Sequence, residues 1–212
     1  GHVKVKGLAD YVTQVDTNIQ NFLREKLGEL APEVEFLGEE DGLHAMKGDT
    51  FWILDPIDGT TNLVHDYQHS TVSLGLYSKG EIILGVIYDP FREEMFYAEK
   101  GKGSFVNGRP IHVAETENLG QTIIAIGTAP YQKELAPRNF ACFQRVFEKC
   151  EDIRRTGSAA MDLAYTAAGR IGGYFEARLQ PWDFAAGMLI LTEAGGKITR
   201  YDGSEVNPGE PG

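Results

Sequence analysis

The chain has 212 residues, of which 42% are hydrophobic and 24% charged, and both values are ordinary for a soluble globular protein. Its length can bury a substantial core, as one large domain or two closely joined ones. The formal net charge is −11 without any block of lysine or arginine, which disfavours a nucleic-acid partner or an anionic membrane surface. No apolar run approaches the roughly 20 residues needed to cross a bilayer. With only two cysteines, Cys142 and Cys150, we expect a reduced, cytoplasmic protein.

The first clear element is a helix that follows Thr13. Thr13 and Asp16 fit a capping box, and apolar side chains then recur at helical spacing as far as Leu30. Helix capping is by itself sufficient reason for an acid at Asp16. A short strand over 34–37 leads into Glu39 and two further acids, whose mutual repulsion either a solvated loop or a bound cation would relieve.

The most informative stretch begins with an apolar run over 51–54, which predicts a buried strand. Pro56 disfavours helical backbone at the preceding residue, so we expect the chain to leave the strand at Asp55. Asp58 follows closely, and Gly59 then opens a helix start whose unpaired amide groups suit an anion. Carboxylates beside a phosphate would repel it unless a cation lay between them, which favours a divalent metal such as Mg²⁺. A turn in which aspartate caps a helix is the alternative.

Further along, short strands with tight turns predict an antiparallel meander. These strands are expected over 71–77, 82–88, 94–98 and 111–113. A hairpin turn is expected at Asn107-Gly108. The amphipathic helix after Thr13 is expected to cover this sheet.

The second half alternates between strands and helices, which is typical of an α/β layer. Strands are expected over 122–126, 153–155, 174–176 and 197–200, and helices over 137–149, 158–168 and 183–194. We therefore divide the chain into residues 1–118, a helix with a meander, and residues 119–212, an α/β half, within one compact catalytic unit. Asp183 opens a helix, where the helix dipole would favour an acid whatever its role. Glu176 lies at a strand tip, where an exposed carboxylate is the simplest reading.

Three stretches resemble the signatures of the inositol monophosphatase family and occur in the family's order. They are Gly38-Glu39-Glu40, Asp55-Pro56-Ile57-Asp58-Gly59-Thr60-Thr61-Asn62 and Trp182-Asp183-Phe184-Ala185-Ala186-Gly187. Agreement at Gly157-Ser158-Ala159-Ala160 extends the resemblance over essentially the whole chain. It implies an α/β fold of the layered αβαβα type, with an antiparallel meander sheet and a second, mixed sheet. It also implies a homodimer and magnesium-dependent, lithium-sensitive hydrolysis of phosphomonoesters.

The same resemblance implies the roles of particular residues around two to three Mg²⁺ ions. The first ion would be held by Glu39, Asp55 and the carbonyl of Ile57, and the second by Asp55, Asp58 and Asp183. A third, weaker ion would lie near Glu39. The catalytic group would be Asp16, Thr60 and Glu39, with the Asp16–Thr60 pair positioning the attacking water. The phosphate would meet the amides of Gly59 and Thr60, and the alcohol would lie against Ser158, Ala159 and Glu176.

The expected substrate is a small phosphorylated polyol, first of all inositol 1-phosphate. Alternatives within the superfamily are fructose 1,6-bisphosphate, NADP and 3′-phosphoadenosine 5′-phosphate. The last is disfavoured because this chain has Asp-Gly-Thr-Thr-Asn where nucleotide-bisphosphate phosphatases often have Asp-Gly-Thr-Lys. A non-catalytic metal- or phosphate-binding interaction protein is the alternative from another class. Against the family pattern, the chain has few residues before Asp10 and stops soon after Asn207, so terminal segments are expected to be missing or deleted. Lys4 or Lys6 would match an early basic residue of the family.

Overall fold

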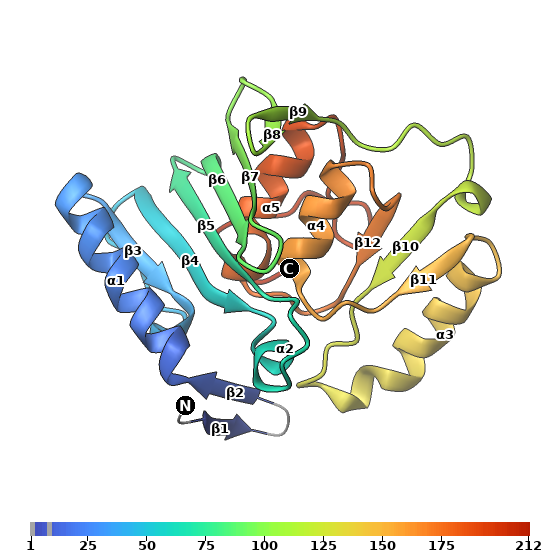
Figure 1. Ribbon diagram of the computed structural model, residues 1–212, viewed down its shortest axis with the longest axis horizontal. Coiled ribbons are helices and arrows are strands. Elements are labelled where there is room, and N and C mark those ends of the chain that lie inside the picture. Colours follow the sequence, from blue (N-terminus) through green and yellow to red (C-terminus); the bar gives the residue numbers. More distant parts are fainter. Residues whose placement is uncertain (1–2, 8–9) are drawn as a thin grey trace.

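The structure, a computed structural model, describes the backbone of residues 3–7 and 10–212 and the side chains from residue 14 onward. Five layers follow one another across the molecule (Figure 1): a helix, a seven-stranded sheet, two helices, a three-stranded sheet and a last helix. In that order the helices are α1 (Gln14–Leu30), then α4 (Ala159–Ala167) with α5 (Pro181–Glu193), then α3 (Ala136–Phe147). The predicted αβαβα architecture is confirmed. Lys4 and Lys6 lie outside the residues whose side chains are described.

The seven-stranded sheet is the predicted meander with one parallel strand added at its edge. Its spatial order is β3-β4-β5-β6-β7-β8-β9, with β3 parallel to β4 and every other pair antiparallel. The strands are β3 (Glu35–Gly38), β4 (Thr50–Asp58), β5 (Thr71–Ser78), β6 (Glu81–Asp89), β7 (Glu94–Glu99), β8 (Ser104–Val106) and β9 (Arg109–Ile111). Asn107 and Gly108 both have positive φ, 47° and 78°, as a two-residue hairpin of this twist requires.

Strand β4 does not end at Asp55, contrary to the sequence prediction. It pairs with β5 at Asp55 and again at Asp58, and the register shifts between them. Pro56 lies within this irregularity, where a missing backbone N–H does not interrupt the ladder. The bulge carries both acids to the end of a buried strand.

The three-stranded sheet has the order β11-β10-β12, and both pairs are parallel. Its strands are β10 (Ile123–Ile126), β11 (Asp152–Arg154) and β12 (Gly173–Phe175). Helix α3 packs against it through Phe143, whose ring centroid lies 5.6 Å from that of Phe175. The strand predicted over 197–200 was wrong: the Arg200 amide instead closes a local turn onto the Ser204 carbonyl at 2.9 Å, so no ladder partner fixes that segment.

The main core lies between the seven-stranded sheet and helices α4 and α5. Ile53, Ile87, Phe96, Met161 and Ile190 are all almost completely buried there. Glycine at position 85 of β6 is required by the approach of α5, because a Cβ atom there would lie 2.6 Å from the Ala186 carbonyl oxygen.

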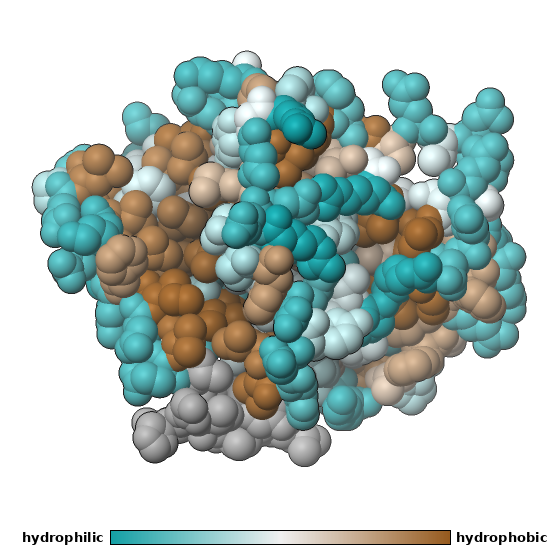
Figure 2. All heavy atoms as spheres, viewed as in Figure 1, coloured by the Kyte–Doolittle hydropathy of each residue, from teal (hydrophilic) through white to brown (hydrophobic). Residues whose placement is uncertain are grey.

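Helix α1 covers the sheet less completely than its apolar spacing predicted. Phe22 is 59% exposed and Leu30 is 76% exposed, and apolar side chains gather around this side of the molecule (Figure 2). The two fully buried side chains of α1 are polar, Asp16 and Gln20. The sheet is therefore covered mainly on its other face, by α4 and α5.

The remaining elements are short. They are β1 (Val3–Gly7) paired with β2 (Asp10–Thr13), α2 (Thr60–Val64), and the 3-10 turns η1 (Glu39–Asp41), η2 (Leu119–Gln121) and η3 (Lys133–Leu135). Cys142 and Cys150 are free thiols, as predicted. Within the described ranges, no helix is both long and apolar enough to cross a membrane.

Candidate metal and phosphate site

Three carboxylates from distant parts of the chain meet where β4 ends against the start of α5. Asp55, Asp58 and Asp183 each offer an oxygen, and these oxygens all lie within 4.8 Å of one another. The sheet and the helix are tied here by the Ser73 hydroxyl, which donates to the Trp182 carbonyl at 3.2 Å. Asp183 is fixed by its own helix start, where it accepts from the Gln180 amide at 2.7 Å. Asp183 therefore has two roles: it caps the start of α5 and it faces the two acids of β4.

The raised pKa values of the three clustered acids indicate that a bound cation would stabilise their ionised forms. Burial raises the pKa of Asp55 well above its usual range, and the charges of Glu39, Asp58 and Asp183 raise it further. Burial likewise raises the pKa of Asp58 to about 6, although the Ser158 hydrogen bond opposes the change. The pKa of Asp183 is raised too, by burial first and then by Asp58. Buried like charges are costly unless a cation compensates them. An all-oxygen donor set fits Mg²⁺ or a similar hard divalent ion.

Glu39 joins this cluster from the neighbouring strand. It follows β3, which runs parallel to β4 with Gly38 opposite Leu54, so both strands deliver their acids at the same edge. Its charge raises the pKa of Asp55, so the two side chains interact. Helix α1 fixes the segment, because Gln20 Oε1 accepts from the Glu40 amide at 3.1 Å. Sequence analysis assigned no role to Gln20, which lies between Ile19 and Asn21 in the predicted helix.

Asp58 is held by the start of helix α4. Its Oδ2 atom accepts from the Ser158 hydroxyl at 2.5 Å and from the Ala160 amide at 2.6 Å. Ser158 is at the same time the N-cap of α4 and accepts from the Met161 amide at 3.3 Å. Ala159 is buried beside it. In this structure the Ser158 hydroxyl therefore orients a carboxylate, and contact with a substrate would be an additional role. The helix start also favours the ionised form of Asp58.

Thr60 and Asp16 form a second polar pair beside the acids. The Thr60 hydroxyl lies 3.2 Å from Asp16 Oδ1 and 3.0 Å from the Ile57 carbonyl oxygen, to either of which it can donate. Asp16 is completely buried although it lies in the first turn of α1. A surface cap would not need such burial, and the arrangement leaves an acid and a hydroxyl facing the end of β4.

The turn before α2 is locked into one conformation. Gly59 has φ 92°, and a Cβ atom there would lie 3.1 Å from the His69 carbonyl oxygen and 3.2 Å from the Gly157 carbonyl oxygen. Asn62, on α2, donates to the carbonyls of both His69 and Thr156, at 2.7 and 2.9 Å. The amides at the start of α2 are thus presented by a rigid turn, as an anion seat requires. Asn62 was in the signature stretch, but sequence reasoning gave it no role.

Glu176 follows β12, on the opposite side of the cluster. Its Oε1 atom accepts from the Ala129 amide at 2.9 Å and its Oε2 atom from the Tyr174 hydroxyl at 2.6 Å. A Cβ atom at Gly127 would lie 1.9 Å from the Glu176 carboxyl carbon, so a side chain at this position would displace Glu176 from its present place. Glu176 and Tyr174 also line a cavity of about 920 Å³. The carboxylate predicted at an exposed strand tip is thus half-buried and held in place.

The sequence analysis did not identify Asp162 as a buried acid. Asp162, on α4, is 2% exposed and accepts from the Thr156 hydroxyl at 2.8 Å, while its other oxygen is buried without a partner among the described residues. Burial raises its pKa to about 8, and the Asp58 and Glu176 charges add to the effect of burial. Asp162 is therefore mostly protonated at neutral pH. Its position as a lone acid within an Ala-rich helix was the feature of the sequence that could have indicated its burial.

Asp162 makes the stability of the protein depend on pH. Its pKa is higher in the folded chain than in the unfolded chain, so its contribution is complete below about pH 4 and is lost as the pH rises through about 8. In that window the free energy of unfolding falls by at most about 1.4 kcal/mol per pH unit from this group. Asp162→Asn is expected to flatten the dependence between pH 5 and 8 in urea unfolding, whereas Asp202→Asn, at an exposed turn acid, leaves it unchanged. An identical slope for Asp162→Asn would contradict the assignment.

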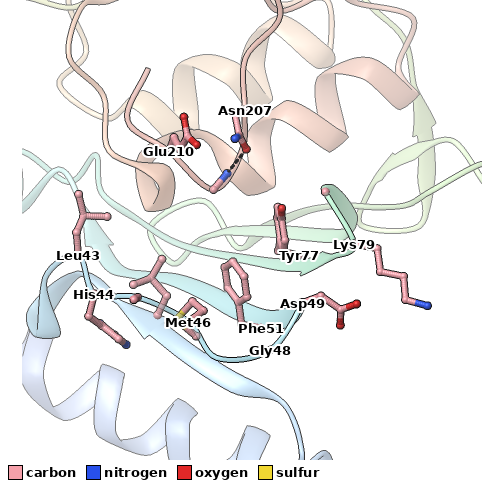
Figure 3. A pocket seen from close by; sticks show the side chains of 14 residues that line it. Leu43, His44, Met46, Gly48, Asp49, Phe51, Tyr77, Lys79, Asn207 and Glu210 are labelled. Carbon is pink, nitrogen blue, oxygen red and sulfur yellow. Dashed lines mark hydrogen bonds between the residues drawn. The ribbon is translucent and has the colours of Figure 1, made fainter.

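A second cavity, of about 480 Å³, is separate from the acids (Figure 3). The stacked rings of Phe51 and Tyr77, with centroids 4.5 Å apart, form one wall, and Met46 and Leu43 lie on another side. None of the clustered carboxylates lines it. The candidate site is therefore the acid cluster and not this cavity.

Fold and site together define a layered α/β protein with an acidic cluster that could hold a metal ion. The model of the inositol monophosphatase family matches residues 1–212, and the chain belongs to the inositol monophosphatase family.

Its relatives carry two kinds of name. The chain is 40% identical to the Nus factor SuhB of Xylella fastidiosa, over 97% of this chain and 74% of that protein. It is also 40% identical to an inositol-1-monophosphatase of Rhizobium meliloti, over 95% of this chain and 76% of that protein. The crystal structure of the extragenic suppressor protein suhB from Bartonella henselae superposes with a TM-score of 0.91 at 39% identity, covering 96% of this chain and 78% of that one.

Proposed function

We propose that the protein is a Mg²⁺-dependent phosphomonoesterase that hydrolyses a small phosphorylated polyol with an activated water molecule. The observation that carries the proposal is the meeting of Asp55, Asp58 and Asp183 within 4.8 Å next to the pair formed by the Thr60 hydroxyl and the buried Asp16. Membership of the inositol monophosphatase family supports the same chemistry. Two divalent ions bound there would lower the pKa of water and stabilise the entering and leaving oxygens.

Different residues of this chain would bind the metal ions, orient the attacking water and accept its proton. Glu39, with the three clustered acids, would hold the metal ions together with the Ile57 carbonyl, which still has room for a second partner beside the Thr60 hydroxyl. Thr60 would accept a hydrogen bond from the water while it donates its own to Asp16, so that the Thr60 oxygen takes the proton of the water as the Thr60 proton passes to Asp16. The Gly59 and Thr60 amides would receive the phosphate oxygens. No covalent nucleophile is needed in this scheme, since positioning and charge stabilisation supply the catalysis.

For the alcohol side of the substrate, Ser158, Ala159 and Glu176 are the proposed contacts. Each Glu176 oxygen already accepts one hydrogen bond, and a carboxylate oxygen has capacity for another. Glu176 would therefore accept from a substrate hydroxyl in a fixed orientation. That requirement favours a polyol, with inositol 1-phosphate as the first candidate. A homodimer and inhibition by lithium are proposed from family membership alone.

A substrate panel tests this function. We expect phosphate release from inositol 1-phosphate with Mg²⁺ and none with EDTA, compared against NADP, fructose 1,6-bisphosphate and 3′-phosphoadenosine 5′-phosphate. Asp183→Asn is expected to lower kcat by about 10³-fold, because it removes a charge from the metal site. Glu193→Gln is the matched control: this carboxylate caps the Gly101 and Gly103 amides far along the same helix and should leave kcat unchanged. Equal activity of Asp183→Asn and the wild type would overturn the proposed site.

A second candidate function is a non-catalytic role as a metal- or phosphate-dependent binding protein. The name Nus factor, carried by a 40% identical relative, is the observation that favours it. The two candidates separate in the same panel. Absence of turnover for every phosphoester, together with retained Mg²⁺ binding, would favour the binding role, whereas turnover of any of them supports the phosphatase.

A further inference from the structure

Tyr174, on β12, is a residue to which the proposed mechanism gives no part. It precedes Glu176 by two residues, and its hydroxyl donates to Glu176 Oε2 at 2.6 Å, a length typical of a charge-assisted hydrogen bond. Burial raises the pKa of Tyr174 well above its usual range, and the charges of Glu176 and Asp162 raise it further. The phenol therefore keeps its proton and remains a donor at physiological pH.

The other oxygen of Glu176 is held by the turn that follows β10. Oε1 accepts from the Ala129 amide at 2.9 Å, and the Gly127 amide donates to the Phe175 carbonyl at 2.9 Å, which ties this turn to β12. Ala129 is buried and has φ 46°. A non-glycine residue with left-handed backbone costs free energy and persists only where the surrounding structure imposes it, as at ligand clamps. The turn thus holds its amide toward Glu176 at some loss of stability.

The charges around Glu176 explain why two donors are needed. The Glu176 charge is among the causes that raise the pKa of Asp58, Asp162 and Asp183, so the carboxylate lies near several other acids. Their repulsion favours an orientation of Glu176 that points away from them. Hydrogen bonds from two donors favour the ionised carboxylate in one orientation, and Tyr174 supplies the one that comes from a side chain.

A carboxylate fixed in this way is prepared for a substrate hydroxyl. Each oxygen of Glu176 has one donor and capacity for another. A flexible glutamate would lose side-chain freedom on binding, and that loss would lower affinity, whereas a glutamate that is already held loses little. The benefit applies only to an alcohol that offers a hydroxyl to Glu176.

We infer that Tyr174 is a positioning residue whose hydroxyl, together with the strained turn at Ala129, fixes Glu176 so that esters of hydroxyl-bearing alcohols are favoured over esters whose alcohol has no free hydroxyl. This inference rests on the proposed phosphatase function and assigns its selectivity for the alcohol to contacts behind Glu176. Tyr174 acts through Glu176, so its effect falls on KM and not on the chemical step.

The test compares wild type, Tyr174→Phe, Glu176→Ala and the double variant on inositol 1-phosphate and on p-nitrophenyl phosphate, whose alcohol has no free hydroxyl. Tyr174→Phe keeps the ring and removes one hydrogen bond. It should lower the ratio of kcat/KM for inositol 1-phosphate to that for p-nitrophenyl phosphate about 3- to 10-fold, through KM. In the Glu176→Ala background the same substitution should not change the ratio further. Tyr97→Phe is the matched control: this ring stacks on Phe105 with centroids 5.4 Å apart, and the ratio should equal that of the wild type.

Calorimetric binding of inositol 1-phosphate and of inorganic phosphate, with Ca²⁺ in place of Mg²⁺, separates this inference from the proposed function. A wild type that hydrolyses neither ester, but binds inositol 1-phosphate more tightly than Tyr174→Phe does, would refute the phosphatase and keep the role of Tyr174. A wild type that neither hydrolyses nor binds would refute both.

Three results would refute the inference alone. The first is an unchanged selectivity ratio in Tyr174→Phe, and the second is an equal loss of selectivity when Glu176 is already replaced. The third is weaker binding of inorganic phosphate by Tyr174→Phe, since a contact behind Glu176 should not act on the phosphate.

Discussion

Asp58→Asn is expected to abolish phosphate release while leaving the metal-free protein folded and at least as stable as the wild type. The amide keeps an oxygen that can accept from Ser158 or Ala160, so the start of α4 stays in place. It removes a charge that raises the pKa of Asp55 and of Asp183, and repulsion within the cluster therefore falls. Because the substitution also removes a proposed metal ligand, kcat should drop by about 10³-fold or more.

The measurement pairs steady-state kinetics on inositol 1-phosphate with thermal melting in EDTA. Asp89→Asn is a useful comparison, since this buried acid caps a turn through the Phe91 amide at 2.9 Å far along the chain from the cluster. It should lower the melting temperature and leave kcat of the folded fraction intact. Asp58→Asn should do the reverse. If Asp58→Asn lost stability and kept its kcat, Asp58 would be a structural acid and not a ligand.

Binding of Mg²⁺ is expected to release protons and to stabilise the protein more strongly as the pH rises. The folded-state pKa of Asp58 is about 6, and those of Asp55 and Asp183 are also raised. Without metal, these groups stabilise the fold most below about pH 4, and that stability is lost as the pH rises through their folded pKa values. Metal ligands must be ionised, so Mg²⁺ displaces these protons and reverses the loss.

Calorimetry of Mg²⁺ binding at pH 6 in two buffers of different ionisation enthalpy measures the protons released. A fixed Mg²⁺ concentration, set at about 100 times the dissociation constant measured at pH 8, should add about 2.7 kcal/mol to the free energy of unfolding at that pH. The same concentration should add less at pH 5, where protons compete for the carboxylates and the dissociation constant is higher. Sodium chloride at equal ionic strength is the control for screening. A gain that sodium chloride reproduces, or binding without proton release, would rule out a carboxylate metal site of this kind.

The sequence predicted best those residues whose position follows from the pattern of their immediate neighbours in the chain. Asp55 and Asp58 end a strongly apolar run, and Asp183 opens a helix, so their position at element ends was visible before their proximity was. The change of pattern along the chain indicated a meander half and an α/β half, and the family resemblance supplied the five-layer order. The family resemblance, and not spacing alone, indicated that Glu39 and Asp16 belong with them.

The contacts that orient the acids were out of reach because they depend on packing between distant segments. Ser158 was predicted to line the substrate, but in the structure its hydroxyl donates a hydrogen bond to Asp58. Nothing in the sequence indicates that the start of α4 lies against the end of β4. Gln20 and Asn62 act in the same way, through bonds to the Glu40 amide and to the Thr156 carbonyl, whereas Tyr174 fixes Glu176 from only two residues away. The strand break expected at Asp55 failed because a bulge accommodates Pro56.

The most direct test of the whole account is phosphate release from inositol 1-phosphate by the wild-type chain as free Mg²⁺ is varied at constant ionic strength and pH 8. We predict a rate that is zero in EDTA, rises with Mg²⁺ to saturation, and returns when Mg²⁺ is restored to the EDTA-treated protein. Hydrolysis that continues unchanged in EDTA would contradict this prediction, because the clustered acids Asp55, Asp58 and Asp183 would then have no part in the reaction.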